Sequence, residues 1–299
     1  MSSLIILFIC VSAGLLLARI KALPENAAQV LNLYVIWVAL PALVLSNMSE
    51  FTLSAAALFP MLVAWAALLV SAVIVVLVVR SAGWSRDTQA VLLLLVPLGN
   101  TSFLGIPLVT ALMGNQVLPY IILYDQLGSF LALATYGTVV VALHSGTAVS
   151  VPVMTRKVLT FPPFIALIGA LLINLFGGLP AVGLVALQAI GATLVPVVMV
   201  AVGLQWRFRL PRDDRWPMVI GLAIKLLLLP LMVWGAMRLL VISPELAQTM
   251  VLESAMAPMI SAGALATLHN YRPQLVAAMV GYGLLFAFAT VPLWWWLLQ

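Results

Sequence analysis

Residues 89–107, QAVLLLLVPLGNTSFLGIP, form a leucine-rich stretch that two prolines, two glycines and the polar residues 100–102 interrupt. Each proline lacks a backbone N–H and therefore leaves a carbonyl unpaired four residues earlier, here at Leu93 and Phe103. In lipid, an unpaired carbonyl is costly unless protein, water or an ion binds it. The stretch therefore predicts a membrane helix that is broken near its middle.

A second broken stretch of this kind lies in the C-terminal half. Residues 248–266, QTMVLESAMAPMISAGALA, align with residues 89–107 when Gln248 is matched to Gln89, and Pro258 interrupts them. A corresponding pair of interrupted apolar segments is the best sequence indication of a transporter binding site. The alternative is a pair of packing kinks whose carbonyls are satisfied by neighbouring Ser and Thr side chains.

The composition of the whole chain requires lipid as its surroundings. The 299 residues are 65% hydrophobic and 7% charged, with a mean hydropathy of +1.23, whereas ordinary soluble domains are about 45–50% apolar and about 25% charged. The net charge of +5 fits basic residues that flank membrane spans. We therefore expect an all-α polytopic membrane protein with the bilayer as a partner and no nucleic-acid partner.

A membrane span needs about 20 apolar residues, and charged and Gly/Pro-rich breaks divide the chain into ten such segments. The predicted helices are residues 3–18, 27–48, 55–79, 88–113, 117–143, 161–176, 182–205, 217–240, 245–269 and 275–298. If the N-terminus lies outside, all but two of the 13 Lys and Arg residues fall in inside loops, the exceptions being Arg238 and Lys225. This alternation predicts that both termini lie outside.

The two halves of the chain are predicted to be inverted repeats. Pro41 in the second predicted helix corresponds to Pro196 in the seventh, and the two broken stretches correspond as described above. Because five is an odd number, the second set of five helices inserts upside down, as in many secondary transporters. The expected divisions are residues 1–143, a cytoplasmic linker at 144–160, and residues 161–299. Chance similarity between apolar helices is the alternative.

Three charged residues of the predicted helices lie near the middle of the bilayer: Asp125, Lys225 and Glu253. A charge at such a depth is expensive and normally faces a cavity or another charge. One interpretation is a structural salt bridge between Lys225 and either acid. The functional hypothesis assigns Glu253 and Asn100 to a coupling cation and makes Asp125 an alternative proton carrier. Lys225 then balances a substrate carboxylate or the empty cation site.

Three segments carry a family resemblance: N-x-x-F-x-G-x-P at residues 100–107, KLLLLP at 225–230 and ESAMAP at 253–258. They resemble the auxin efflux carrier family, including its bacterial malonate and malate permease-like members, and the resemblance covers essentially the whole chain. The family fold, similar to that of bile acid sodium symporters, implies a scaffold of helices 1, 2, 6 and 7. Helices 3–5 and 8–10 then form a moving domain in which helices 4 and 9 cross at their unwound points. The implied mechanism is elevator-type alternating access.

The expected binding residues gather at this crossing. For the substrate they are Asn100, Thr101, Ser102, Gly105, Pro107, Lys225, Pro258, Ser261 and Gly263. For the coupling ion they are Asn100, Ser102, Asp125, Ser129 and Glu253, because the segment at Glu253 looks like the acidic sodium-ligand stretch of the bile acid symporters. Sodium is expected at Glu253 and Asn100, and no other cofactor is expected.

The predicted function is secondary active transport of a small organic anion, such as a mono- or dicarboxylate, coupled to sodium or protons. The third predicted helix contains no Asp or Lys, which argues against auxin itself. The alternatives are an exporter of amphipathic organic acids, a channel or sensor, and an intramembrane enzyme. The chain has no H-E-x-x-H or G-x-S-x-G motif, so no enzyme is expected. We expect a bacterial inner (plasma) membrane location, with a homodimer as a candidate assembly.

Overall fold

The computed structural model describes residues 2–20, 23–24, 26–49, 58–146, 150–205 and 212–299. These residues form helices and one isolated antiparallel bridge, with no β-strand among them. Six described helices are long and apolar enough to cross a bilayer, or seven if one bent pair counts as a single span. The all-helical, multi-pass prediction is thus confirmed, while the count of ten spans and the inverted repeat stay predictions.

The elements are short because many helices are interrupted by π-helical turns (η1, η3, η5, η6, η8) or begin with a 3₁₀ turn (η4, η7). In chain order they are α1 (Ser2–Arg19), α2 (Ala27–Tyr34), η1 (Val35–Ala39), α3 (Leu40–Met48), α4 (Phe59–Ala82), α5 (Arg86–Leu95), η3 (Thr101–Gly105), α6 (Ile106–Met113), η4 (Asn115–Val117), α7 (Leu118–Leu123), η5 (Tyr124–Phe130), η6 (Leu133–Gly137), α8 (Thr138–Ser145), α9 (Val151–Leu159), α10 (Pro162–Leu175), α11 (Ala181–Ala192), α12 (Leu194–Gln205), η7 (Arg212–Asp214), α13 (Arg215–Ala223), η8 (Ile224–Leu228), α14 (Leu229–Arg238), α15 (Pro244–Ser254), α16 (Ile260–Leu268) and α17 (Pro273–Leu297).

Some sequence predictions fall outside the described residues. These are residues 55–57 of the third predicted helix, the inside-loop residues Lys21, Arg207 and Arg209, and residues 147–149 of the predicted linker. The described part of that linker contains the helix α9, which the sequence analysis did not anticipate. It meets α10 at a bend of 62°.

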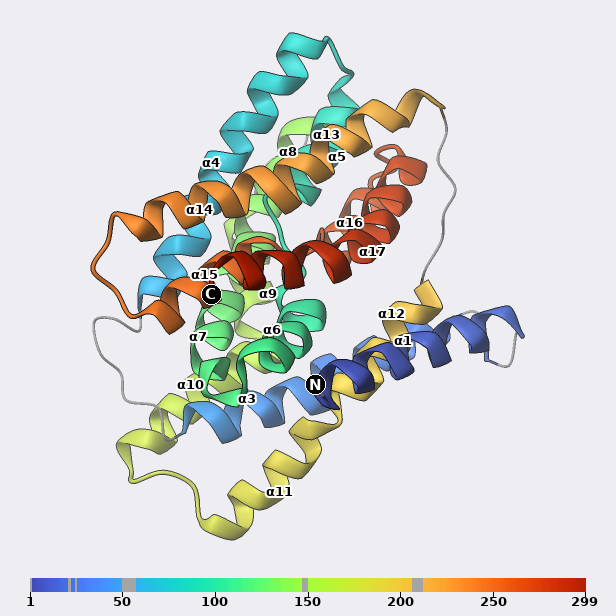
Figure 1. Cartoon of the computed structure of the whole chain (residues 1–299). Helices are drawn as coiled ribbons and strands as arrows, with labels where there is room; N and C mark the ends of the chain where they lie inside the picture. The colour runs from blue at the N-terminus through green and yellow to red at the C-terminus, as the bar shows by residue number, and fades with distance from the viewer. Residues whose placement is uncertain (1, 21–22, 25, 50–57, 147–149, 206–211) are drawn as a thin grey trace.

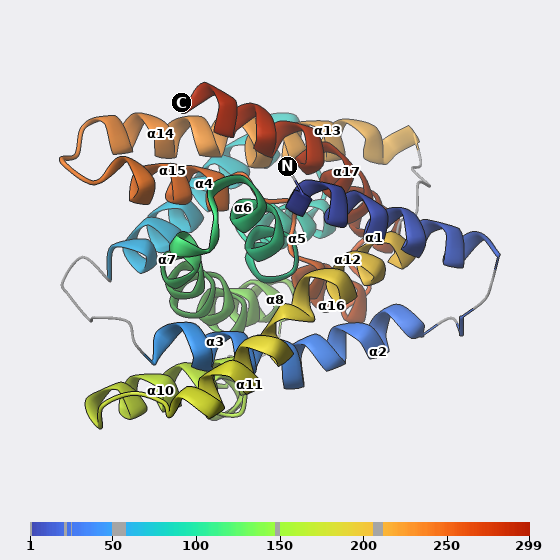
Figure 2. The same ribbon diagram turned by 60° about the horizontal axis from the view of Figure 1, so that its bottom comes forward.

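The helices pack in two groups (Figures 1 and 2). In the first group, α1 packs against α12, α12 against α2, and α10 and α11 against α3. In the second group, α4 packs against η5, α14 against α15, and α16 and α17 against α5. Fewer contacts join the groups, chiefly from α6 to α1, from η3 to α12 and from α7 to α3. Between the groups lie α6 and α7, which contact α1 and α3 on one side and α15 on the other.

Glycines set the closest helix packing of the first group. A Cβ atom on Gly14 of α1 would lie 3.0 Å from the Cα of Gly203 in α12 and would overlap the carbonyl oxygen of Val200. A Cβ on Gly203 would overlap the carbonyl oxygen of Val11 in the same way. Small residues let membrane helices approach closely enough for extensive van der Waals contact. Larger side chains at either glycine would therefore separate α1 from α12.

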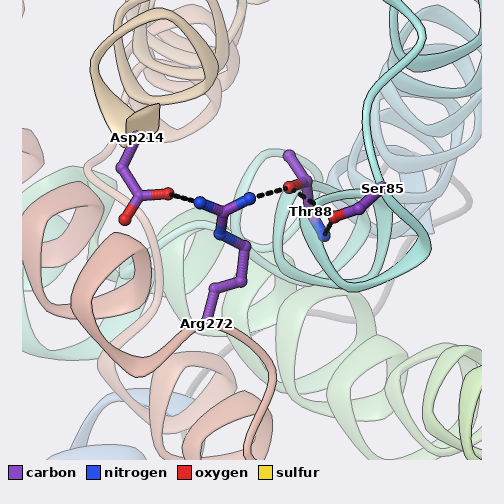
Figure 3. Close-up of polar contacts among 4 residues, drawn as sticks. All are labelled: Ser85, Thr88, Asp214 and Arg272. Carbon is purple, nitrogen blue, oxygen red and sulfur yellow. Dashed lines mark hydrogen bonds and ion pairs between the residues drawn. The ribbon is translucent and has the colours of Figure 1, made fainter. Parts of the chain in front are cut away.

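Arg272 ties three helices together at one end of the second group (Figure 3). Its Nη2 lies 2.7 Å from Oδ1 of Asp214, just before α13, and its Nη1 donates a hydrogen bond of 3.1 Å to Oγ1 of Thr88. The Thr88 amide in turn donates to Oγ of Ser85, which caps α5. Arg272 is the residue before α17. This cluster therefore joins the starts of α5, α13 and α17.

Candidate functional site

The two broken stretches meet and pair through their backbones. The amide of Asn100 donates to the carbonyl of Ala257 at 2.8 Å, and the amide of Met259 donates to the carbonyl of Leu98 at 3.0 Å. Gly99 and Pro258 face each other in an antiparallel bridge. Each break thus satisfies polar backbone groups of the other, as a bilayer core requires. The α5 to α6 segment therefore crosses the α15 to α16 segment at this bridge.

The carbonyl of Leu93, which Pro97 leaves without a helical partner, has a side-chain donor. The hydroxyl of Tyr136, in η6, donates a hydrogen bond of 2.9 Å to it. Nothing in the sequence indicated this contact, because the tyrosine lies 43 residues further along the chain. Tyr136 therefore helps to stabilise the first break.

Tyr136→Phe is expected to lower the stability of the protein while keeping its ring packing. Removing the hydroxyl leaves a buried carbonyl unsatisfied, which costs about 1–3 kcal/mol. The loss would be measured as a lower thermal unfolding midpoint of the purified protein in detergent. An unchanged midpoint would contradict a stabilising role for this hydrogen bond.

Asp125, in η5, is held by three hydrogen-bond donors. Oγ1 of Thr101 and Oγ of Ser102 each donate to its Oδ1 at 2.5 Å, and Nε2 of Gln126 donates to its Oδ2 at 2.6 Å. The side chain is buried. Two of these donors come from the polar residues that follow the first break, so Asp125 is fixed against the crossing.

Glu253, in the last turn of α15, is fully buried, and neither of its carboxylate oxygens has a hydrogen-bond partner in the described structure. Its carboxylate lies against the backbone of Gly105. A Cβ atom on that glycine would lie 2.6 Å from Oε2 and 2.8 Å from Oε1. Buried polar groups are normally paired, so a buried carboxylate without a protein partner is suited to binding a proton or a cation.

Lys225, in η8, is also buried and lies beside the bridge. A Cβ on Gly99 would lie 3.0 Å from its Nζ. Among the described residues, only Arg272 and Asp214 form an ion pair with an N···O distance of 4.0 Å or less. The salt bridge considered above, between Lys225 and Asp125 or Glu253, is therefore wrong for this structure. Glu253 and Lys225 remain close enough for electrostatic interaction.

Two cavities flank the crossing. The Asn100 cavity has a volume of about 70 Å³ and is lined by Ile36, Leu40, Asn100, Ser102, Phe103, Asp125, Phe130, Leu133, Phe161, Met259, Ile260 and Ser261. The Glu253 cavity has a volume of about 10 Å³ and is lined by Ala64, Leu68, Pro97, Leu98, Gly99, Thr101, Tyr124, Gly128, Ser129, Ala132, Lys225 and Glu253. The first is mainly apolar with a polar wall, and the second holds two ionisable side chains.

Most predicted site residues lie at one of these cavities. Asn100, Ser102, Asp125 and Ser261 line the Asn100 cavity, and Thr101, Ser129, Lys225 and Glu253 line the Glu253 cavity. Asn100 and Glu253, predicted to share a sodium ion, thus line different cavities.

Four predicted residues line neither cavity: Gly105, Pro107, Pro258 and Gly263, of which Gly105 lies against the Glu253 carboxylate. Pro258 forms the bridge and packs on Gly283, Pro107 lies in the first turn of α6, and a Cβ on Gly263 would meet Val276 and Val280 of α17. Sequence reasoning missed the aromatic wall, where the rings of Phe130 and Phe161 stack with centroids 3.7 Å apart. No motif marked these two residues.

The chain matches a known family along nearly its full length. The family model described as "Membrane transport protein" matches residues 1–295. The chain belongs to this family. The resemblance to the auxin efflux carriers is thereby confirmed, since this model represents that family.

Two transporters from other organisms are similar to the chain. One is an uncharacterized transporter of Methanothermobacter thermautotrophicus, 26% identical over 96% of this chain and 94% of its own length. The other is an uncharacterized transporter of Methanocaldococcus jannaschii, 24% identical over 100% of this chain and 98% of its own length. The protein is therefore a multi-pass membrane transporter, which points away from an enzyme.

Proposed function

We propose that this transporter carries a small organic anion, a mono- or dicarboxylate, by secondary active transport coupled to sodium or protons. The observation that supports this most is the crossing of two broken helices between a polar-walled cavity and a cavity with an unpaired carboxylate. Broken helices that meet in a membrane expose both half-helix N-termini and unpaired backbone groups, which suit ions of opposite sign. In this proposal the substrate site and the coupling-ion site lie on the two sides of the crossing.

The Asn100 cavity suits the carboxylate of the substrate. Nδ2 of Asn100 is buried and has no acceptor within the described part of the chain, while its Oδ1 accepts a hydrogen bond from the amide of Phe103. Ser261 adds a hydroxyl in the first turn of α16. The N-terminal ends of η3 and α16 carry partial positive charge toward this wall. A carboxylate would thus meet donors on one side and apolar surface on the other.

The Glu253 cavity suits the coupling ion. Its unpaired carboxylate, with the hydroxyls of Thr101 and Ser129 on the same cavity wall, offers the oxygen ligands or proton acceptor that coupling needs. Lys225 supplies a competing positive charge that balances Glu253 when the ion has left. Asp125 is the alternative proton carrier, since it shares the substrate's cavity.

The packing supports an elevator-type movement. Ile36, Leu40 and Phe161 of the first group line the Asn100 cavity opposite residues of the crossing in the second group. A sliding of the second group along the first would carry the crossing, and the anion with it, across the membrane. In this proposal the ten predicted spans form two inverted repeats, and both termini face outward from a bacterial inner membrane. A homodimer is the proposed assembly.

An exporter of amphipathic organic acids is the second candidate. The aromatic pair Phe130 and Phe161, together with Leu133 and Ile260, makes one side of the Asn100 cavity strongly apolar. Such a wall favours acids with a sizeable apolar body over very small dicarboxylates. The two candidates share the carboxylate site and differ in the size of the substrate.

Uptake by proteoliposomes tests the proposal. Labelled malonate and malate are supplied with an imposed sodium gradient or an imposed proton gradient, each alone. Uptake driven by one gradient identifies the coupling ion. A second assay loads a larger aryl carboxylate inside the liposomes and measures its efflux. If neither gradient drives uptake of malonate or malate, and neither drives efflux of the aryl carboxylate, the proposal of organic-anion transport is wrong for this chain.

Asn100→Ala is expected to abolish uptake. Asn100→Ser distinguishes loss of the helix cap from loss of the amide donor as the cause. Serine caps helices as well as asparagine does, so it keeps the turn after the break but lacks the amide donor. We expect Asn100→Ala to lower both thermal stability and uptake, and Asn100→Ser to lower uptake alone through a raised KM. Near wild-type uptake by Asn100→Ser would show that the side-chain amide of Asn100 does not bind the substrate.

A further inference from the structure

An apolar groove runs between α4 and α14, away from the crossing. It has a volume of about 380 Å³ and is lined by twelve residues, among them Phe59, Ala66 and Val70 on one side and Leu229, Met237 and Leu240 on the other. All twelve side chains are hydrophobic, and Leu62 and Leu240 are 59% and 48% exposed. The groove is therefore open to the surrounding lipid along its length.

A more polar hollow adjoins one end of this groove. It has a volume of about 470 Å³, and Met237 and Leu240 line both spaces, which makes them continuous. The polar side chains of the hollow are Arg238 and Gln248, and Trp234 lies beside them. Nε2 of Gln248 donates to the carbonyl of Leu298, so the end of the chain forms part of the wall.

The charge of Arg238 is available to a ligand in this hollow. Its guanidinium lies 5.9 Å from the centroid of the Trp234 ring, and no acid of the described residues lies within ion-pair distance of it. Glu245 is near in sequence but does not line the hollow. A planar guanidinium on an aromatic face presents its N–H groups to a phosphate oxygen pair. Tryptophan is also typical of the level of the lipid headgroups.

The groove has the depth of one leaflet. On α4 it extends from Phe59, the first residue of the helix, to Val70. Eleven residues at 1.5 Å each give about 17 Å, close to half of a hydrocarbon core of about 30 Å. On α14 the lining runs in the opposite direction, so its deep end is Leu229 and its shallow end adjoins Arg238. The cation thus lies where a headgroup would be if an acyl chain filled the groove.

We propose that the groove and the hollow together bind one anionic phospholipid, with an acyl chain between α4 and α14 and its phosphate at Arg238. A second copy of the chain is less suited to this place, because the space is a narrow concavity that ends at a charge rather than a broad apolar face. The site is independent of the Asn100 and Glu253 cavities, and its test does not depend on transport.

Native mass spectrometry of the full-length protein in detergent tests this site. The probes are phosphatidylglycerol and phosphatidylcholine with the same acyl chains, and glycerol phosphate without chains. We expect one phosphatidylglycerol to be retained about fivefold more strongly than phosphatidylcholine, as one interfacial Arg provides. Equal retention of the two lipids would overturn the proposal. Glycerol phosphate bound as strongly as the lipid would also overturn it, by indicating a small-anion site.

Two pairs of variants separate headgroup from chain. Arg238→Gln is expected to remove the preference for phosphatidylglycerol, while Arg80→Gln, at the other end of α4, keeps it. Ala66→Trp fills the groove and is expected to weaken retention of both lipids, whereas Leu69→Trp, on the same helix outside the groove lining, does not. Unchanged retention in Arg238→Gln or Ala66→Trp would overturn the proposal. The proposal would also be overturned if the protein formed a dimer that Ala66→Trp dissociated, because the groove would then hold a second copy of the chain.

Discussion

Glu253→Gln is expected to abolish gradient-driven accumulation of substrate while the protein still folds and inserts. Glutamine keeps the size of the side chain but removes the negative charge from the Glu253 cavity. If that charge binds the coupling cation or proton, accumulation should fall by about 100-fold or more, equivalent to about 2.7 kcal/mol. Folding should be preserved, because no described residue pairs with this carboxylate in the native protein.

The measurement compares gradient-driven uptake with exchange of labelled for unlabelled substrate across the same liposomes. Exchange does not require the empty carrier to reorient, so it should survive and show that the variant is folded. Glu245→Gln is the matched control, since Glu245 lies on the same helix, outside both cavities. Wild-type accumulation by Glu253→Gln would place the coupling ion elsewhere and direct attention to Asp125.

Gly105→Ala is expected to impair transport through the same carboxylate. The added methyl group would lie 2.6 Å from Oε2 of Glu253, closer than van der Waals contact allows. The carboxylate would have to move away from the crossing, since the backbone of η3 is held by the bridge. A displacement of about 1 Å at a functional group often costs 100-fold, so we expect uptake to fall by roughly tenfold or more.

Gly137→Ala is the matched control for this substitution. Gly137 also lies in a π-helical turn, but a Cβ there would have its nearest neighbour at 3.5 Å, an ordinary contact. Removing a glycine from a helix interior is favourable by roughly 0.5–1 kcal/mol, so this variant should keep its transport rate and stability. If Gly105→Ala and Gly137→Ala transport equally well, the position of the Glu253 carboxylate does not limit coupling.

The sequence was most informative where backbone chemistry decides the structure. Pro97 and Pro258 cannot continue a helix, and lipid does not tolerate the polar groups that they release, so two breaks in membrane helices were predictable. The buried charges were predictable for a related reason, because Asp125, Lys225 and Glu253 interrupt apolar runs. Both inferences rest on costs that apply to any bilayer, whatever the tertiary structure.

The sequence did not reveal which cavity each side chain lines, because this depends on the orientation of the side chains at the crossing. Asn100 starts the second half of one broken helix, whereas Glu253 ends the first half of the other, and the bridge between the breaks lies between their cavities. The prediction that Asn100 and Glu253 share one ion site assumed only that each residue lies near a break. Tyr136 and Phe161 reach the site from distant segments, and no spacing rule connects such residues to the motif.

The Arg272 cluster constrains how the second group can deform. It fixes the starts of α5, α13 and α17, which come from three separate parts of the sequence, at a single point. These helices therefore cannot separate from one another at that end. A force applied to any one of them is transmitted to the other two, so in the sliding movement proposed above this end of the second group moves as one unit.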